Sequence, residues 1–325
     1  NYGSLPLYAG KALEGALSPF TGLGFSEIRL VGRSLSALAD VGTGLMIFFL
    51  ATRLYSRLVG ILASLLAALA VLHIQLSHFY AVDTYLTFFI VSSLYFMVRL
   101  MQEGRLRNSL LAGAFIGLAL ACKISVAPLF LAFVAAHAIY VFSGPGERLA
   151  LLRPSRAFLA TIVRNLILGG MASIAVFFIT TPYAFLDWYR PNPCDVPFSF
   201  LRFLDTNYFA CDIGAQYDMV RGTSSLPFTQ QYIGTTPYWY QIKQLALFGL
   251  GLPLGIVAWT SVLFTVFLAV ANRSKGDLLI LAWVIPYFLL TGYLQVKFLR
   301  YMLPLTPFLL IMGSRTLFWL RDWFA

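Results

Sequence analysis

One aspartate, Asp83, stands out as a residue that could do acid–base chemistry. It lies between two apolar segments in LHIQLSHFYAVDTYLTFFIVSSLYFMVR, residues 72–99, and this stretch holds no second carboxylate. At the start of a helix, such a carboxylate can accept backbone N–H bonds as a cap. It can also take a proton from a reacting hydroxyl as a general base. The sequence leaves both roles open for Asp83.

Three cations and a tyrosine are candidates for binding a phosphate. Lys123 lies in the turn Ala-Cys-Lys-Ile-Ser, and Lys297, Arg300 and Tyr301 lie in LQVKFLRYMLPLTPFLL near the C-terminus. Lys297 and Arg300 are three positions apart, so on a helix they would share a face and could clamp a phosphate together. The alternative is that these cations snorkel from apolar helices to a membrane surface.

A third group of residues has the character of a sugar-binding surface. The stretch GTSSLPFTQQYIGTTPYWYQIKQ, residues 222–244, is rich in Tyr, Trp, Gln and Thr. Such side chains stack on sugar rings and hydrogen-bond to them, although aromatic belts at membrane interfaces have a similar composition. The candidates for contact with a sugar or an acceptor are His78, Tyr80, Gln231, Tyr232, Tyr238 and Trp239.

The elements that position these residues are predicted to be membrane-spanning helices. The chain is 59% hydrophobic and 11% charged, with a mean hydropathy of +0.79, whereas soluble domains have about 25% charged residues. Apolar runs of a length that can cross a bilayer recur along it. We therefore expect an all-α, polytopic transmembrane helix bundle of about nine spans, at residues 29–52, 58–76, 84–101, 108–122, 125–142, 158–181, 243–271, 278–294 and 302–320.

The formal net charge of +10 is explained by the loops that carry it. Most arginines, among them Arg53, Arg57 and Arg105, fall in alternate loops, and the positive-inside rule places those loops in the cytoplasm. No nucleic-acid partner is needed to account for the charge. The candidate residues lie in the opposite loops, so we expect a multi-pass plasma-membrane protein whose active face is extracytoplasmic.

The predicted organisation is one transmembrane module, residues 29–320, preceded by an extracytoplasmic loop. Residues 1–28 are rich in Gly, Ser and Pro, and Ser18-Pro19 indicates a loop. The chain begins at Asn1 without a visible signal peptide. Because this end is predicted to lie outside, we expect a further span upstream of it. Residues 182–242 form a second, long extracytoplasmic loop.

Cysteine, histidine and one intramembrane aspartate complete the set of chemically interesting residues. Cys194 and Cys211 share the long outer loop and could form a disulfide, which leaves Cys122 free. Asp40 lies about half-way along the first span, where it either packs against a hydrogen-bond donor or binds substrate. His73 and His78 have no acidic or Cys neighbour and lack a recognised ligand spacing, so no metal site and no cofactor are predicted.

Five blocks of the chain, in order, resemble a known family. These blocks are HFYAVDTYLTFFIVSSLYFMVR, GAFIGLALACKISVAPLFL, TTPYAFLDW, YIGTTPYWYQIKQLALFGLGLPLG and VKFLRYMLPLTPFLL. Together they resemble the polyprenyl-phosphate-sugar-dependent, or phospholipid carrier-dependent, glycosyltransferases of the multi-spanning C-type fold. Within these, the chain is most similar to the protein O-mannosyltransferases and the lipid A aminoarabinose transferase.

This resemblance implies transfer of a sugar, with inversion, from a polyprenyl-phosphate carrier to an acceptor that is a protein, a lipid or a glycan. Asp83 falls on the family's acidic residue that opens a helix after the second outer loop. Lys123 falls on the Lys of its Thr-Lys-Gly-like turn, and Arg300-Tyr301 on its Arg-Tyr pair before the last helix. The resemblance implies no divalent metal.

The chain departs from the family pattern at its start. The family's principal catalytic acid lies in the first outer loop, and the acids of residues 1–28, Glu14 and Glu27, do not match its context. The resemblance therefore implies that this acid and the first span lie upstream of Asn1, and the activity of this chain alone stays open. The alternatives are a transporter or flippase for lipid-linked sugars and a non-catalytic membrane subunit on the same fold.

Overall fold

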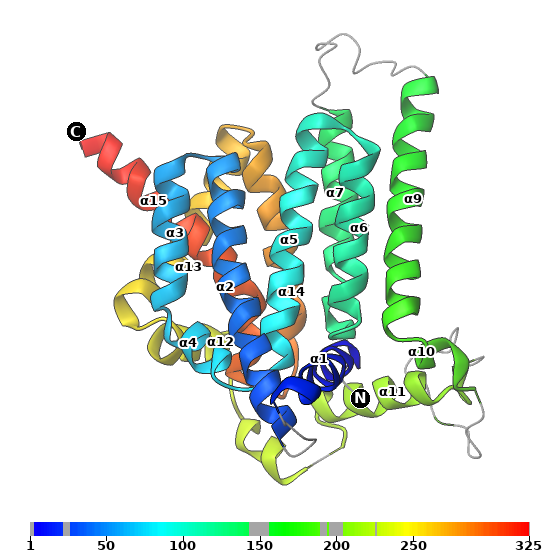
Figure 1. Cartoon of the computed structure of the whole chain (residues 1–325). Coiled ribbons are helices and arrows are strands. Elements are labelled where there is room, and N and C mark those ends of the chain that lie inside the picture. The colour runs from blue at the N-terminus through cyan, green and yellow to red at the C-terminus, as the bar shows by residue number, and fades with distance from the viewer. Residues whose placement is uncertain are drawn as a thin grey trace.

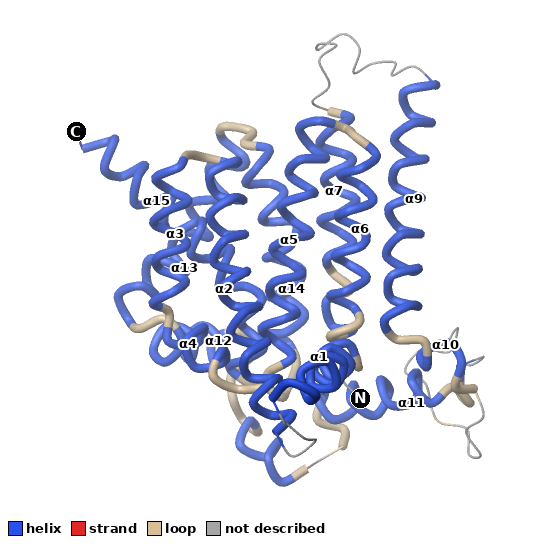
Figure 2. The backbone as a smooth tube through the Cα atoms, viewed as in Figure 1, coloured by secondary structure: helices blue, strands red, loops and turns tan. Residues whose placement is uncertain are grey.

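The computed structural model describes residues 3–21, 27–142, 156–188, 194, 204–224 and 226–324. Within these ranges the chain folds into helices joined by turns and contains no β-strand (Figure 2). The expected all-α fold is therefore confirmed.

Long apolar helices run roughly parallel through the molecule and form its main body (Figure 1). Seven helical segments in the described ranges are long and apolar enough to cross a membrane. They are α2 (Ile28–Leu54), α5 (Val82–Glu103), η2 (Ile124–Val126) continued by α7 (Leu129–Val141), α9 (Arg156–Thr180), α13 (Leu252–Ala271), α14 (Lys275–Tyr293), and η6 (Leu299–Leu305) continued by α15 (Thr306–Phe324).

Two further segments bring the count close to the nine that the sequence predicts. The helices α3 (Arg57–Leu69) and α4 (Val71–Ser77) would make an eighth span together, but they are bent by 59° at their junction. The helix α6 (Leu106–Leu120) is apolar but has only 15 residues. The chain thus has the expected multi-spanning helical architecture, with one broken span and one short one.

Shorter helices gather at one end of the bundle, which we call the site end (Figure 1). They come from the N-terminal region, from the broken span and from the segment between α9 and α13. Their bounds are α1 (Leu5–Thr21), α4, α10 (Tyr183–Leu186), α11 (Tyr208–Arg221), η4 (Pro227–Tyr232), α12 (Trp239–Gln244) and the π-helical η5 (Leu245–Gly249). The predicted outer loop at 182–242 is therefore largely helical where it is described.

The expectation of a loop over residues 1–28 is wrong for Leu5–Thr21, which forms α1. Pro6 lies in the first turn, where the missing N–H has no helical partner to lose. Pro19 removes one interior bond, but the Gly15 carbonyl that would have received it accepts the Ser18 hydroxyl at 3.2 Å. Ser18-Pro19 thus lies in the last turns of a helix and does not prevent its formation.

Two packing features fix the bundle around α5. Its side chains are buried along most of its length, including Leu86, Ile90 and Leu94, because α2, α6, α7 and η6 all pack against it. Beside it, α6 and α9 approach closely at glycines. A Cβ on Gly113 would lie 1.9 Å from the Gly169 carbonyl oxygen. Small residues at such positions allow helices in a membrane to come into backbone contact.

The opposite end of the bundle is held by a buried ion pair. Asp277 of α14 pairs with Arg315 of α15 and accepts the Tyr55 hydroxyl at 2.7 Å. The Arg315 guanidinium also lies 4.5 Å from the centre of the Tyr55 ring. These contacts join the first turn of α14 and the middle of α15 to the end of α2.

Candidate functional site

Asp83 lies at the site end, in the first turn of α5, and it does not cap that helix. The N-cap residue is Ala81, whose carbonyl accepts the Thr84 hydroxyl at 2.8 Å. Asp83 is only 6% exposed, and its carboxylate Oδ1 lies 3.3 Å from Lys123 Nζ. Of the two roles that the sequence left open, the capping role is therefore excluded by the position of the helix start.

Lys123 reaches Asp83 from the tight turn between α6 and η2. The N–H of Lys123 donates to the Ala119 carbonyl at 3.0 Å, and the N–H of Gly3 donates to the Cys122 carbonyl at 3.0 Å. The ammonium lies 3.9 Å from the centre of the Tyr301 ring. Lys123 therefore has a carboxylate on one side and an aromatic face on another, which is a favourable setting for a partly buried cation.

Tyr301 is held in place by the 3₁₀-helix η6, which precedes α15. Its backbone carbonyl accepts the Tyr287 hydroxyl of α14 at 3.1 Å. Pro304, whose carbonyl accepts the Trp283 indole N–H at 3.4 Å, interrupts regular α-helical bonding in this segment. As a result, Tyr301 is 4% exposed and presents its ring to Lys123. The sequence could not indicate Tyr287 or Trp283, because they act through tertiary contacts alone.

An apolar cavity of about 200 Å³, which we call the Lys123 cavity, begins at this cluster. Its polar lining comes from Lys123, Ser125, Gln216, Tyr217, Tyr287, Thr291 and Tyr301. Its apolar walls come from α11, α14 and the end of α6, namely Phe209, Ile213, Val220, Leu290, Leu294 and Leu120. The cavity therefore offers one cation in a mainly apolar pocket, a combination that suits a charged head group with a hydrocarbon tail.

Lys297 and Arg300 do not share a helical face, and this expectation is wrong because η6 begins at Leu299. Lys297 is 3% exposed and donates to the Thr235 hydroxyl and to the Gln295 carbonyl, both at 3.1 Å. It lines a different cavity from Lys123. Arg300 is exposed, with its guanidinium carbon 4.9 Å from the Phe298 ring centre and 5.9 Å from that of Tyr301. Lys123 therefore contacts the Tyr301 ring, whereas Lys297 lines the other cavity.

The candidates for sugar contact in 222–244 are divided between surface and interior. Gln231 and Trp239 are exposed, and Trp239 is 62% accessible. Tyr232 is buried and packs edge-on against Tyr240 and Phe298. Its burial raises the pKa of its phenol, an effect that exceeds the opposing influence of Arg300. Only the exposed members are free to stack on a ligand as the molecule stands.

Tyr238 has a strained backbone. Its φ is 61° with ψ −55°, and the Trp239 N–H donates to the Pro237 carbonyl at 2.6 Å, which together describe a γ-turn of the uncommon positive-φ kind. The Tyr238 N–H donates to the Gly292 carbonyl at 3.1 Å, and its ring packs where a Cβ on Gly292 would lie. Non-glycine residues persist in such conformations only when their surroundings hold them.

Tyr80 and His78, which follow α4, have different partners. The Tyr80 hydroxyl donates to the Pro6 carbonyl of α1, and the ring fills the space next to Gly32. Burial raises the pKa of this phenol. His78 is exposed, and its Nδ1 donates to the Ile74 carbonyl at 2.6 Å.

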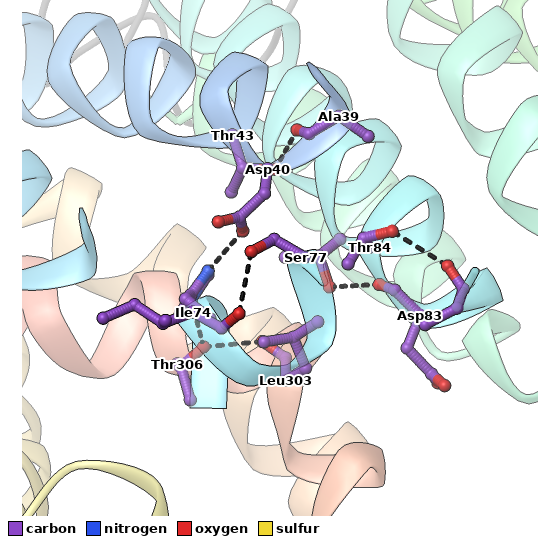
Figure 3. A network of polar contacts seen from close by, with 12 residues as sticks. Ala39, Asp40, Thr43, Ile74, Ser77, Asp83, Thr84, Leu303 and Thr306 are labelled. Atoms are coloured by element: carbon purple, nitrogen blue, oxygen red, sulfur yellow. Dashed lines mark hydrogen bonds and ion pairs between the residues drawn. The ribbon is translucent and has the colours of Figure 1, made fainter. Parts of the chain in front are cut away.

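A buried polar network joins three helices beside the site (Figure 3). His73 of α4 is 2% exposed, with Nδ1 2.7 Å from Asp40 Oδ1 and Nε2 2.7 Å from Thr306 Oγ1. Asp40 thus has the donor that its depth in the first span requires. Figure 3 shows the Asp83 side chain pointing away from this network. No group of three His, Cys, Asp or Glu side chains that could hold a metal is found in the described ranges.

Cys194 and Cys211 are joined by a disulfide, with their Cα atoms 5.7 Å apart. Cys211 lies in the first turn of α11, where the Asn207 side chain caps the helix by accepting the Ala210 N–H at 2.9 Å. The cap and the disulfide fix the end of α11 that carries Phe209 and Ile213 into the Lys123 cavity. Cys122 is free and buried.

The sequence of residues 20–168 matches the model of the dolichyl-phosphate-mannose-protein mannosyltransferase family. No curated protein has a sequence that matches the chain. This family match supports the resemblance that the sequence blocks carry.

Solved structures share the fold over nearly the whole chain. The oligosaccharyltransferase of Archaeoglobus fulgidus, in its apo form, matches with a TM-score of 0.61 and 15% identity over 98% of this chain and 42% of its own length. ArnT from Cupriavidus metallidurans, bound to undecaprenyl phosphate, matches with a TM-score of 0.58 and 17% identity over 97% of this chain and 50% of its own. AglB from A. fulgidus, in complex with an inhibitory peptide and a dolichol-phosphate, has a TM-score of 0.58 and 14% identity over 98% of this chain. The chain thus spans half or less of the length of these proteins and has the fold of the C-type multi-spanning glycosyltransferases.

Proposed function

We propose that this chain, which has the fold of glycosyltransferases that use lipid-linked donors, is the part of such an enzyme that binds the carrier and moves its sugar to an acceptor. The donor is a polyprenyl-phosphate-linked sugar, and transfer takes place at the extracytoplasmic membrane face with inversion. The observation that carries this proposal is the Asp83–Lys123 ion pair beside Tyr301, where Lys123 and Tyr301 line a mainly apolar cavity.

The Lys123 cavity supports a lipid phosphate as the donor group. Its apolar walls would take the first part of a hydrocarbon chain, whose transfer from water to such a wall is favourable by about 25 cal/mol per Å². The Lys123 ammonium would hold the phosphate where its charge develops as the sugar leaves. Two of the solved relatives are bound to polyprenyl or dolichol phosphates, which supports the same class of ligand for this chain.

Asp83 would act as the base in a single displacement. The acceptor hydroxyl oxygen forms a bond to the anomeric carbon, the bond from that carbon to the carrier phosphate oxygen breaks, and the hydroxyl proton passes to the Asp83 carboxylate. The carrier phosphate leaves with the electron pair of the broken bond, and attack from the opposite side inverts the anomeric centre. An arriving phosphate would draw Lys123 from Asp83, which leaves the carboxylate without its counter-charge and readier to accept a proton.

The test is sugar transfer from a panel of polyprenyl-phosphate sugars, measured in membranes with the full-length gene product. We expect Asp83→Asn to lower kcat by roughly 10²–10⁴-fold, the usual contribution of a general base. The matched control is Asp218→Asn, because Asp218 is an exposed acid of the same end whose partner is Thr223. Both variants are compared at equal expression and equal thermal stability.

Two outcomes would contradict the proposal. Equal transfer by wild type and Asp83→Asn would reduce the Asp83–Lys123 pair to a packing contact. If the wild type transferred no sugar from any donor of the panel, the proposed glycosyltransferase function would be wrong. Transport of lipid-linked sugars would then be favoured.

A further inference from the structure

A second cavity, of about 380 Å³, lies next to the Lys123 cavity at the site end. Three segments build it: the C-terminal end of α11, the stretch between η4 and α12, and the turn between α14 and η6. Its polar lining comes from Arg221, Tyr232, Thr235, Tyr293, Gln295 and Lys297. We call it the Arg221 cavity.

This cavity carries positive charge without a matching carboxylate. Among the residues that the structure describes, neither Arg221 nor Lys297 forms an ion pair with an acidic side chain. Lys297 is almost fully buried, and its two hydrogen-bond partners are neutral oxygens. Because an ammonium has three N–H groups, a third donor remains for a ligand.

Burial of an uncompensated ammonium is unfavourable, so a bound anion would stabilise the site. A charged group that is buried beside neutral partners alone costs free energy that an opposite charge restores. Consistent with this, burial lowers the pKa of Lys297 below the ordinary value of lysine. The Arg221 guanidinium, exposed at the rim and 5.8 Å from the Tyr217 ring, adds donors suited to the two oxygens of a carboxylate or phosphate.

The Arg221 cavity is a neighbour of the Lys123 cavity but is not part of it. Leu294 lines both cavities, whereas Lys123 lines only the first and Lys297 only the second. The Val296 N–H donates to the Val220 carbonyl at 3.0 Å, which ties the α14–η6 turn to the end of α11. Gly222 allows this contact, because its φ is +88° and any Cβ there would collide with Gln295.

We infer that Arg221 and Lys297 form a second oxyanion site, which binds a phosphate or carboxylate of the acceptor substrate beside the carrier phosphate at Lys123. The inference rests on the proposed function for the identity of the two substrates. Thr235, Gln295 and the Tyr293 phenol supply hydrogen-bonding groups for the hydroxyls of the same ligand. The acceptor is therefore an anionic molecule, and its charge binds in the cavity next to the one that takes the carrier phosphate.

The first test measures binding without turnover, so that it does not depend on sugar transfer. The probe is inorganic phosphate, and the readout is the rise in Tm of the purified full-length protein with phosphate concentration. All measurements use a Lys123→Gln background, which removes the cation of the neighbouring cavity. We expect phosphate to stabilise this protein, and we expect a further Arg221→Gln to weaken the apparent affinity by roughly tenfold or more, as for loss of a charge-assisted contact.

Two variants control for general effects of charge and of folding. Lys243→Gln removes an exposed cation of α12, at the same end but outside both cavities, and should leave the phosphate dependence unchanged. Lys297→Arg keeps the charge and should keep phosphate binding, whereas Lys297→Gln should lose it. Lys297 is buried, so Lys297→Gln could fail to fold. In that case the test rests on Arg221→Gln, which changes an exposed residue.

Three results would overturn the inference. They are an absence of phosphate stabilisation in the Lys123→Gln background, equal stabilisation with and without Arg221→Gln, and displacement of phosphate by undecaprenyl phosphate at saturating concentration. The last would assign the site to the carrier. Loss of transfer activity in Asp83→Asn has no bearing on any of the three, so failure of this inference is distinguishable from failure of the proposed function.

Discussion

At the residue scale, the Lys123 ammonium contacts groups of different kinds, among them a carboxylate at 3.3 Å and an aromatic ring at 3.9 Å. The ring contact lets us separate the role of Tyr301 as an aromatic surface from that of its hydroxyl. A cation–π contact of this type contributes about 0.5–2 kcal/mol, depending on how far the cation is desolvated. We therefore expect the affinity for the donor to depend on the aromatic ring of Tyr301 and not on its hydroxyl.

We predict that Tyr301→Leu raises the KM for the polyprenyl-phosphate donor by about 2- to 30-fold, the factor that corresponds to this range of free energy. Tyr301→Phe keeps the ring and is the matched control, with a KM close to that of the wild type. Steady-state kinetics in membranes would check both. If Tyr301→Phe were as impaired as Tyr301→Leu, the hydroxyl would be the functional group and the cation–π account would be wrong.

At the scale of elements, the contact between α6 and α9 deserves a test because α6 leads directly into the Lys123 turn. The two backbones meet at Gly113 and Gly169, and Gly117 likewise faces the Ser173 carbonyl. Helices in a membrane associate through such close packing, since lipid offers no hydrophobic driving force between them. One methyl group at the contact must force the helices apart.

We predict that Gly113→Ala lowers the stability of the protein by about 1–3 kcal/mol, the usual cost of overpacking a close contact. The matched control is Gly170→Ala on α9, where an added Cβ meets no atom within 4 Å. That control should be neutral or slightly stabilising, because alanine favours a helix more than glycine does. Thermal unfolding of the full-length protein in detergent compares the two, and equal effects would show that this contact does not limit stability.

At the scale of the whole molecule, several arginines lie at the end of the bundle opposite to the candidate site. Arg53 lies in the last turn of α2, Arg105 between α5 and α6, and Arg273 between α13 and α14. These helix ends lie away from α1, α11 and α12 (Figure 1). The positive-inside rule then predicts that the site end faces away from the cytoplasm. The Asp277–Arg315 pair lies at the far end, beside a cavity that Tyr55, Lys275 and Arg315 line.

Cysteine labelling would check this orientation. The native cysteines of the described chain are a disulfide and the buried Cys122, which gives a low background. We predict that Ser224→Cys, at the site end, reacts with a membrane-impermeant maleimide in intact cells. Asn272→Cys, at the opposite end, should react only after permeabilisation. The reverse pattern would invert the membrane orientation and with it the proposed face of transfer.

Much of the fold could be predicted from the order of residues, but the composition of the site could not. The nine apolar segments correspond to helices, because the length and hydropathy of a segment determine locally whether it can cross a membrane. Within the loop expected at 1–28, Leu5–Thr21 is instead α1, since the Ser18 side chain satisfies the carbonyl that Pro19 leaves without a donor. Such compensation by a neighbouring side chain is not visible in a pattern of glycine and proline.

The sequence by itself determined that Asp83 opens a helix at a membrane surface and that cations lie at the same end. Only the tertiary structure decided that Lys123, 40 positions away, pairs with Asp83, and that Lys297 lines a cavity together with Arg221. The physical reason is that burial and helix formation depend on short stretches of the chain, whereas ion pairs depend on which helices pack together and on where each begins. The start of η6 at Leu299 alone separates Lys297 from the helical face that its spacing had suggested.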